Sequence, residues 1–176
     1  MQMMVLTSKW FLGALVALLV LLSVLFVLGK KSVHTERIIE ASPEKVWSVL
    51  MNTSEYKNWN QVLVPISIAT HSGELSEGAD VIYEFFQEPG SSYKIPSRVK
   101  QLIPERMLNQ RGGTPGVLTF DHRYILMPQS DNTLLIVHED YRGVAVPFWD
   151  PAPVEEAYRR LAKALNNRVM ELEGSE

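Results

Sequence analysis

The chain has 176 residues, which suits one domain with an appendage, and its formal net charge is −3. This charge, and the lack of a basic stripe with interleaved aromatic residues, give no reason to expect a nucleic-acid partner. The sequence contains no cysteine, so disulfides and thiolate metal sites are excluded. Its histidines show no metal-ligand spacing, and neither a P-loop nor a dinucleotide-binding fingerprint is present. We therefore expect no metal and no cofactor.

An uncharged apolar segment near the N-terminus, Trp10–Gly29, predicts a membrane-spanning helix. As a helix it would be roughly 30 Å long, which matches the hydrocarbon core of a bilayer. The alternative is a cleaved signal peptide, but such peptides have apolar regions of about 7–15 residues and end in an A-x-A-like site, which this segment lacks. We expect residues 1–31 to form a single-pass membrane anchor and residues 32–176 to form a separate domain. Lysines flank the segment on both sides, so the positive-inside rule does not assign the side of the membrane on which the domain lies.

The domain opens with a strand and two short helices. Alternating apolar and polar residues predict a strand over Ser32–Ile39. Ser42 is a suitable N-cap for a helix that has Pro43 at its first position. A second short helix is expected through Tyr56 and Trp59. Two short helices between the first strands would close one end of a curled sheet.

Six further strands are predicted by alternation and by turn residues between them. Pro96 indicates that its strand is an edge or a bulged strand, and the glycine-rich residues 112–116 are expected to be a loop. The predicted ranges are Val64–Thr70, Ala79–Gln87, Tyr93–Ile103, Arg106–Arg111, Val117–Met127 and Leu134–Val146.

One long amphipathic helix, from about Pro153 to Glu171, closes the chain. Its apolar stripe contains Val154, Tyr158, Leu161, Leu165, Val169 and Leu172. A run of antiparallel strands and one terminal helix pack most simply when the sheet curls around the helix. We therefore predict an α+β fold in which a curved antiparallel sheet wraps the C-terminal helix and leaves a space between the two.

The last two strands bring one ionisable pair together. With the hairpin centred between Ser130 and Asp131, the apolar residues of both strands share one face, and a slip of one residue would separate them. In this register His122 lies opposite Glu139 on an otherwise apolar, inward surface. The pair has three possible roles: mutual satisfaction that fixes the register, anchoring of a polar group of a ligand, or general acid–base catalysis.

Long stretches of residues 33–172 resemble the helix-grip (SRPBCC) superfamily, which includes START lipid-transfer domains, birch pollen allergen relatives and polyketide cyclase/dehydrase-like proteins. In particular His122, Glu139 and Gly143 resemble the polyketide cyclase-like branch, whereas Gln110 stands where that branch often has an aromatic residue. The matching stretches are ERIIEASPEKVWSVL, YKNWNQV, GELSEGADV, SRVKQLIPERMLNQRGG and FDHRYILMPQSDNTLLIVHEDYRG.

The resemblance implies an internal pocket for an apolar ligand, such as a lipid, a hormone or a polyketide. It leaves two functions open: a membrane-anchored protein that binds a hydrophobic small molecule or lipid, and a cyclase or dehydrase-type enzyme. A scaffold whose pocket is filled by its own side chains is a third, weaker alternative. The expected pocket residues are His122, Glu139, Tyr83, Phe85, Leu118, Phe120, Tyr124, Tyr141, Tyr158, Leu161 and Leu165.

Two aromatic residues before the terminal helix, Phe148 and Trp149, have two possible roles. In a functional role they would form the mouth of the pocket or lie at a membrane interface. In a structural role they would pack onto the helix as a hydrophobic staple.

Overall fold

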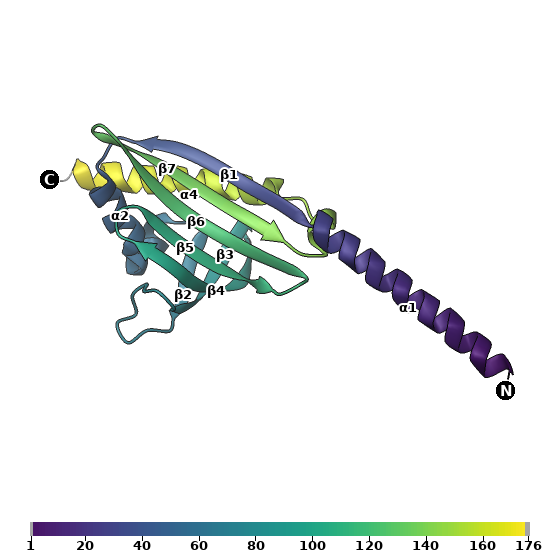
Figure 1. The fold of residues 1–176 in the computed structure, drawn as a ribbon. Helices are drawn as coiled ribbons and strands as arrows, with labels where there is room; N and C mark the ends of the chain where they lie inside the picture. The colour runs from purple at the N-terminus through teal and green to yellow at the C-terminus, as the bar shows by residue number, and fades with distance from the viewer. Residues whose placement is uncertain (1, 175–176) are drawn as a thin grey trace.

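The computed structural model describes the backbone of residues 2–174 and the side chains of residues 9–174. It contains one long N-terminal helix followed by an α+β domain in which a seven-stranded antiparallel sheet wraps the C-terminal helix (Figure 1). The predicted helix-grip architecture is confirmed. Met1, Ser175 and Glu176, which the predicted boundaries include, lie outside the described residues.

The N-terminal helix α1, Gln2–Leu28, projects away from the domain (Figure 1). Its segment Lys9–Leu28 is long and apolar enough to cross a membrane, and none of it is buried against the rest of the chain. Strand β1, Lys30–Ile39, begins only one residue after the helix ends. The domain is therefore joined to α1 without a linker.

Two short helices follow β1, as predicted. Helix α2, Pro43–Met51, has Pro43 at its start and is capped by Ser42, whose side chain accepts a hydrogen bond from the Lys45 backbone N–H at 3.3 Å. A 3-10 turn, Thr53–Glu55, leads into helix α3, Tyr56–Trp59. Tyr56 and Trp59 are buried and pack edge to face, with ring centroids 4.9 Å apart. The burial of these two rings holds α3 against the core.

The sheet has the order β1-β7-β6-β5-β4-β3-β2, and neighbouring strands are antiparallel throughout. Each predicted strand is present, with ends that differ by a few residues. The bounds are β2 Leu63–Ile68, β3 Asp80–Glu88, β4 Ser91–Ile103, β5 Met107–Thr114, β6 Leu118–Gln129 and β7 Asn132–Arg142.

The register predicted for the last hairpin is confirmed. His122 pairs with Glu139, Phe120 with Tyr141, Tyr124 with Val137, and Leu126 with Leu135. His122 and Glu139 are both 3% exposed, although each carries an ionisable side chain. Strand alternation and the short turn thus place a polar pair on the concave, apolar face of the sheet.

Strand β4 was predicted to be an edge or a bulged strand. It is an interior strand, and its pairing with β5 shifts between Val99 and Gln101, as in a bulged strand. Pro96 lies just beyond the last β4–β5 partners, Ser97 and Gly112, so its missing N–H falls where this pairing ends.

Gly112 and Gly113, which were expected in a loop, belong instead to strand β5, which continues to Thr114 and pairs with β6, whereas Gly116 lies in the turn as expected. A Cβ atom at Gly112 would lie 2.4 Å from the Phe120 ring and 2.3 Å from the Pro96 carbonyl oxygen. Glycine is therefore required here because it leaves space for the Phe120 ring on the concave face.

The C-terminal helix α4, Ala152–Glu173, fills the concave side of the sheet. The side chains of its predicted apolar stripe are buried from Val154 to Val169, and Leu172 is partly buried against the core. A 3-10 turn, Val146–Phe148, connects β7 to the start of α4. These elements form one core between the helix and the sheet.

Candidate ligand-binding site

A cavity of about 290 Å³ lies between the first two turns of α4 and the concave face of the sheet. Its wall is mainly aromatic and aliphatic. Helix α4 contributes Val154 and Tyr158, and the segment before it contributes Trp149, whose ring packs on Tyr141 with centroids 4.4 Å apart. The sheet contributes Phe85, Tyr93, Lys94, Ile95, Pro96, Gly113, Leu118, Phe120, Glu139 and Tyr141.

A second, much smaller cavity of about 20 Å³ adjoins the first, because Ile95, Phe120, Glu139 and Tyr158 line both. Its remaining lining residues are Leu63, Tyr83, Ser97, Gln110 and His122. Its volume is enough for one water-sized group. The site is thus an apolar chamber with a small, polar inner end.

Glu139 accepts hydrogen bonds from two tyrosines at the boundary between these chambers. The Tyr141 hydroxyl donates to Glu139 Oε2 at 2.6 Å, and the Tyr158 hydroxyl donates to the same oxygen. Tyr141 belongs to the same strand as Glu139, whereas Tyr158 comes from α4. The carboxylate therefore ties the terminal helix to the sheet, which compensates part of the cost of burying it.

Burial keeps these phenols protonated. Desolvation raises the pKa of Tyr158 well above its usual value, and the nearby Glu139 carboxylate and the hydrogen bond to it raise this pKa further. The pKa of Tyr141 is raised by the same causes in the same order. Burial also raises the pKa of Tyr83 to about 12. The Gln110 side chain donates a hydrogen bond to the Tyr83 hydroxyl at 2.6 Å, and this bond lowers the pKa by a smaller amount. The tyrosines of the site are neutral hydrogen-bond donors across the physiological pH range.

His122 lies beside Glu139 but is not hydrogen-bonded to it. The distance from His122 Nδ1 to Glu139 Oε2 is 3.7 Å, and neither ring nitrogen has a hydrogen-bond partner among the described residues. Its ring packs edge to face against Tyr124 and Tyr158, with centroids 4.6 and 5.0 Å away. The buried Ser97 hydroxyl likewise has no partner in residues 9–174. Buried polar groups are nearly always satisfied, so these atoms are available to a bound molecule.

The structure brings eight of the eleven expected pocket residues to these two cavities. Phe85, Leu118, Phe120, Glu139, Tyr141 and Tyr158 line the larger one, and Tyr83 and His122 line the smaller one. Tyr124, Leu161 and Leu165 line neither and are packed in the core.

Sequence reasoning missed Ser97 and Ile95 on β4, and Trp149 before α4 was left with two possible roles. The alternation of β4 contained the signal: Ile95 and Ser97 pair with Tyr83 and Val81, whose side chains were expected to face inward. Pro96 obscured this pattern.

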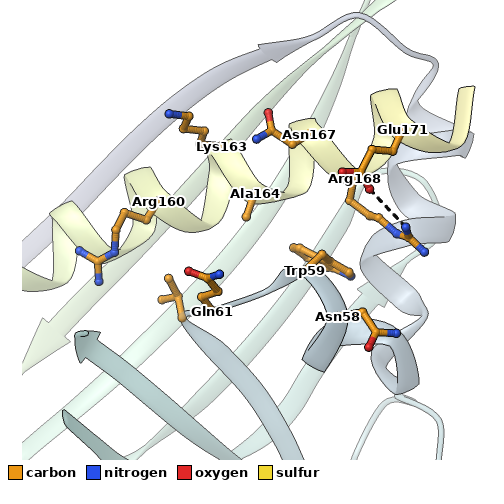
Figure 2. A pocket seen from close by; sticks show the side chains of 10 residues that line it. Asn58, Trp59, Gln61, Arg160, Lys163, Ala164, Asn167, Arg168 and Glu171 are labelled. Carbon is orange, nitrogen blue, oxygen red and sulfur yellow. Dashed lines mark hydrogen bonds and ion pairs between the residues drawn. The ribbon is translucent and has the colours of Figure 1, made fainter. Parts of the chain in front are cut away.

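Larger hollows, of about 440, 460 and 530 Å³, lie on the surface and are lined mostly by polar side chains. Figure 2 shows the one between α3 and α4, whose lining includes Arg160, Lys163 and Arg168, spaced along α4. Arg168 pairs with Glu171 at 3.3 Å, and Arg160 donates to the Gln87 carbonyl at 2.8 Å. The charge of Arg168 is thus partly neutralised, and Arg160 is held by a backbone carbonyl. In the described part of the chain, no group of three His, Asp or Glu side chains could hold a metal ion.

The curved sheet, the enclosed C-terminal helix and the cavity between them define a protein of the helix-grip (SRPBCC) class, with a START-like, polyketide cyclase-like fold. The family model described as "Activator of Hsp90 ATPase homolog 1-like protein" matches residues 40–171. The chain belongs to this family. No curated protein shows significant similarity to the sequence.

Solved structures share the fold at low sequence identity. A START superfamily protein from Mycobacterium smegmatis is 23% identical, with a TM-score of 0.64 over 80% of this chain and 98% of its own. The Zhui aromatase/cyclase from a Streptomyces species is 16% identical, with a TM-score of 0.62 over 80% and 94%. Norcoclaurine synthase from Thalictrum flavum, solved in complex with dopamine and hydroxybenzaldehyde, is 15% identical, with a TM-score of 0.58 over 81% and 87%. These likenesses establish the fold.

Proposed function

We propose that this chain is a membrane-anchored protein that binds a small hydrophobic molecule carrying one polar group in the cavity between α4 and the sheet. Two features of the cavity together carry the proposal. The main chamber, of about 290 Å³, is apolar. At its inner end, buried polar atoms of Ser97 and His122 have no hydrogen-bond partner among the described residues. Ligand sites in proteins are typically apolar clefts with a few placed polar groups. A scaffold filled by its own side chains would have no reason to keep this space.

The size and chemistry of the cavity narrow the class of ligand. Its volume is at the lower end for small-molecule sites, so it suits a compound of one or two rings, or a single acyl chain, and not a two-chain phospholipid. A hydroxyl or carbonyl group at the inner end would reach Ser97 and His122, and the body of the ligand would contact Phe120 and Leu118. Such a ligand satisfies the polar atoms and buries its apolar surface.

The membrane part of the proposal is supported by α1. Its apolar stretch, Lys9–Leu28, has the length of a membrane span and is unburied, so an aqueous location would expose a large apolar surface. A helix that was only the core of a soluble fold would be covered by other elements. We infer that α1 lies in a bilayer and that the domain lies on one side of it.

The test uses the full chain in lipid nanodiscs and two matched probes, naphthol and naphthalene, with binding measured by isothermal titration calorimetry against empty nanodiscs. Naphthol should bind about tenfold or more tighter than naphthalene, because only naphthol can satisfy the polar atoms at the inner end. Ser97→Ala should narrow this difference. Leu118→Asp on the wall should remove binding, whereas Met127→Asp, an exposed position outside the cavity, should not. Binding of neither probe above the empty nanodiscs would refute the proposal.

An enzyme of the cyclase or dehydrase type is the second candidate. The observation in its favour is a buried imidazole with both nitrogens unpartnered in the described chain, 3.7 Å from a carboxylate that two tyrosines hold in place. Such an imidazole could take a proton from an activated carbon beside a carbonyl group. Two proteins with this fold, the aromatase/cyclase and norcoclaurine synthase, carry enzyme names.

The variant His122→Gln separates the two candidates. If His122 is a general base, turnover of an enolisable aromatic ketone should fall by about 100-fold or more in this variant. If the protein only binds, the same ketone should be recovered unchanged, and His122→Gln should alter its affinity alone.

A further inference from the structure

The junction between α1 and the domain is rigid. Gly29 is the only residue between Leu28 and Lys30; it is buried, and its carbonyl oxygen accepts a hydrogen bond from the Gly143 N–H at 3.0 Å. A Cβ atom at Gly29 would lie 1.9 Å from the Gly143 carbonyl oxygen. The end of the helix is therefore held against the start of the sheet by a hydrogen bond and close packing, with no flexible linker between the two.

The surface around this junction has the composition of a membrane interface. Phe148 is 78% exposed and Val117 is 48% exposed. The exposed basic residues Lys30 and Arg142 pair with each other where β1 begins and β7 ends. Aromatic residues together with Lys and Arg are typical of positions level with lipid headgroups. We call these four residues the junction rim.

Hydrogen bonds fix the junction rim next to the start of β1. The Ala145 N–H donates to the Val117 carbonyl at 3.0 Å, which joins the two loops that carry the apolar residues. Lys31 donates to the Pro147 carbonyl at 3.4 Å and also to the Trp149 carbonyl. Phe148 is thus presented outward between two residues whose backbone is held against β1.

The apolar cavity lies at this same end of the sheet. Leu118 and Trp149 line the cavity, and each is adjacent in the chain to an apolar residue of the junction rim. The register agrees, because Tyr141 on the cavity wall pairs with Lys31 and with Phe120. Figure 1 shows α1 leaving the domain from this end, away from the end where α2 lies.

We propose that the junction rim inserts into the surface of the bilayer that holds α1, so that the cavity faces the membrane and exchanges its hydrophobic ligand directly with the bilayer. The inference rests on the membrane anchor proposed above. The occupant of the rim is the lipid surface, because the rim is continuous with an apolar helix one residue away and carries both aromatic and basic side chains. An apolar ligand would then pass from lipid to cavity without crossing water.

The test exploits the absence of cysteine in the sequence. Single cysteines are introduced in the full chain by Val20→Cys in α1, Phe148→Cys in the rim and Asp131→Cys in the β6–β7 turn, and each is labelled with a nitrobenzoxadiazole dye in vesicles of phosphatidylcholine. Asp131 lies at the far end of β6, roughly 40 Å along the strand from the rim. Spin-labelled phosphatidylcholine should quench the dyes at positions 20 and 148 and leave the dye at position 131 unquenched.

The outcomes separate the anchor from the docking surface. The docking proposal is overturned if the dye at position 20 is quenched but the dye at position 148 is quenched no more than the dye at position 131. The anchor is unaffected by that result. This result is also expected if a second copy of the chain or another protein covers Phe148. A dye at position 20 that is not quenched overturns the anchor itself, and the docking proposal with it.

The rate of ligand uptake tests whether the ligand enters the cavity directly from the bilayer. Prodan, a naphthalene derivative with two rings and one carbonyl group, is dissolved in the vesicles as the probe, and its uptake is followed by energy transfer from the protein's tryptophans. Phe148→Asp should slow uptake by roughly tenfold, since it removes an inserted aromatic side chain, while the final occupancy stays the same because Phe148 does not line the cavity. Met127→Asp, which changes another exposed apolar residue near the far end of β6, should not slow it. An unchanged rate in Phe148→Asp would overturn direct loading from the bilayer, and the final occupancy reports separately whether the cavity binds at all.

Discussion

Tyr158 of α4 donates a hydrogen bond to Glu139 of β7, across the space that separates the helix from the sheet. Glu139 accepts a second hydrogen bond, from Tyr141, on the same carboxylate oxygen. The contact lies at the boundary between the apolar chamber and its polar inner end. One buried carboxylate thus holds the helix in place and shapes the site.

Replacing Glu139 separates its structural role from a role in binding. Glu139→Leu leaves the Tyr141 and Tyr158 hydroxyls buried without their acceptor, and should lower the free energy of unfolding by about 1–3 kcal/mol. Glu139→Gln keeps the shape and one amide oxygen as acceptor, so its loss should be smaller. Urea denaturation of both variants measures these differences. If the carboxylate anchors a ligand, Glu139→Gln should weaken binding of naphthol while the melting temperature changes little. Equal stability of Glu139→Leu and the parent would contradict the structural role.

The buried tyrosines predict alkaline unfolding. The pKa of Tyr83 is about 12 in the folded state and 10.0 as its ordinary value. Between these two pH values the unfolded chain loses a proton that the folded chain keeps, so stability is unaffected below pH 10 and falls as the pH rises toward 12. Tyr83 alone should remove about 3 kcal/mol over this range, at 1.36 kcal/mol per pKa unit.

Tyrosinate absorbance and circular dichroism, followed together from neutral to alkaline pH, check this expectation. The main rise of tyrosinate absorbance should coincide with the loss of secondary structure, since the pKa values of Tyr56, Tyr124, Tyr141 and Tyr158 are raised as well. Full ionisation near pH 10 with the fold intact would contradict it. Tyr83→Phe is the control, and its stability should fall less steeply between pH 10 and pH 12.

The arrangement of strands was predictable because each hairpin is local. Alternation and a two-residue turn define which side chains of β6 and β7 share a face, and the pairing of His122 with Glu139 followed from these two constraints alone. The capped helix at Ser42 and Pro43 was predictable for the same reason, because its signals lie within one turn.

The contacts between α4 and the sheet were not predictable in the same way. The apolar stripe shows which face of the helix is buried, but not how far the helix slides along the sheet. The cavity lies only against its first turns, at Val154 and Tyr158, whereas Leu161 and Leu165 pack fully in the core. The hydrogen bond from Tyr158 to Glu139 depends on this translation, which no local pattern in the sequence encodes.

Gly143 is expected to be intolerant of any side chain. Its φ angle is +141°, and a Cβ atom would lie 2.2 Å from the Val117 carbonyl oxygen. Gly143→Ala should therefore lower the free energy of unfolding by about 3 kcal/mol or more. Gly116→Ala is the matched control, since its φ angle is +79° but a Cβ atom there meets nothing within 4 Å; its cost should be about 1–2 kcal/mol. Chemical denaturation of the two variants measures the difference, and equal losses would show that the collision with Val117 relaxes.

The last prediction concerns the independence of the domain from α1. Strand β1 begins at Lys30, which pairs with Arg142 of β7. A truncation that ends before Gly29 therefore preserves the sheet. Removing residues 1–31 would also remove the first two residues of β1. Deleting residues 1–28 should release a monodisperse, folded domain, because no part of Lys9–Leu28 is buried against it. The released domain should give the circular dichroism spectrum of an antiparallel sheet with one long helix and should unfold cooperatively. Aggregation of this truncated chain in aqueous buffer would show that α1 is part of the fold.

N-terminal sequencing of the full chain recovered from cells is the companion measurement, because a retained residue 1 or 2 identifies an anchor, and a new N-terminus after residue 28 identifies a cleaved signal peptide.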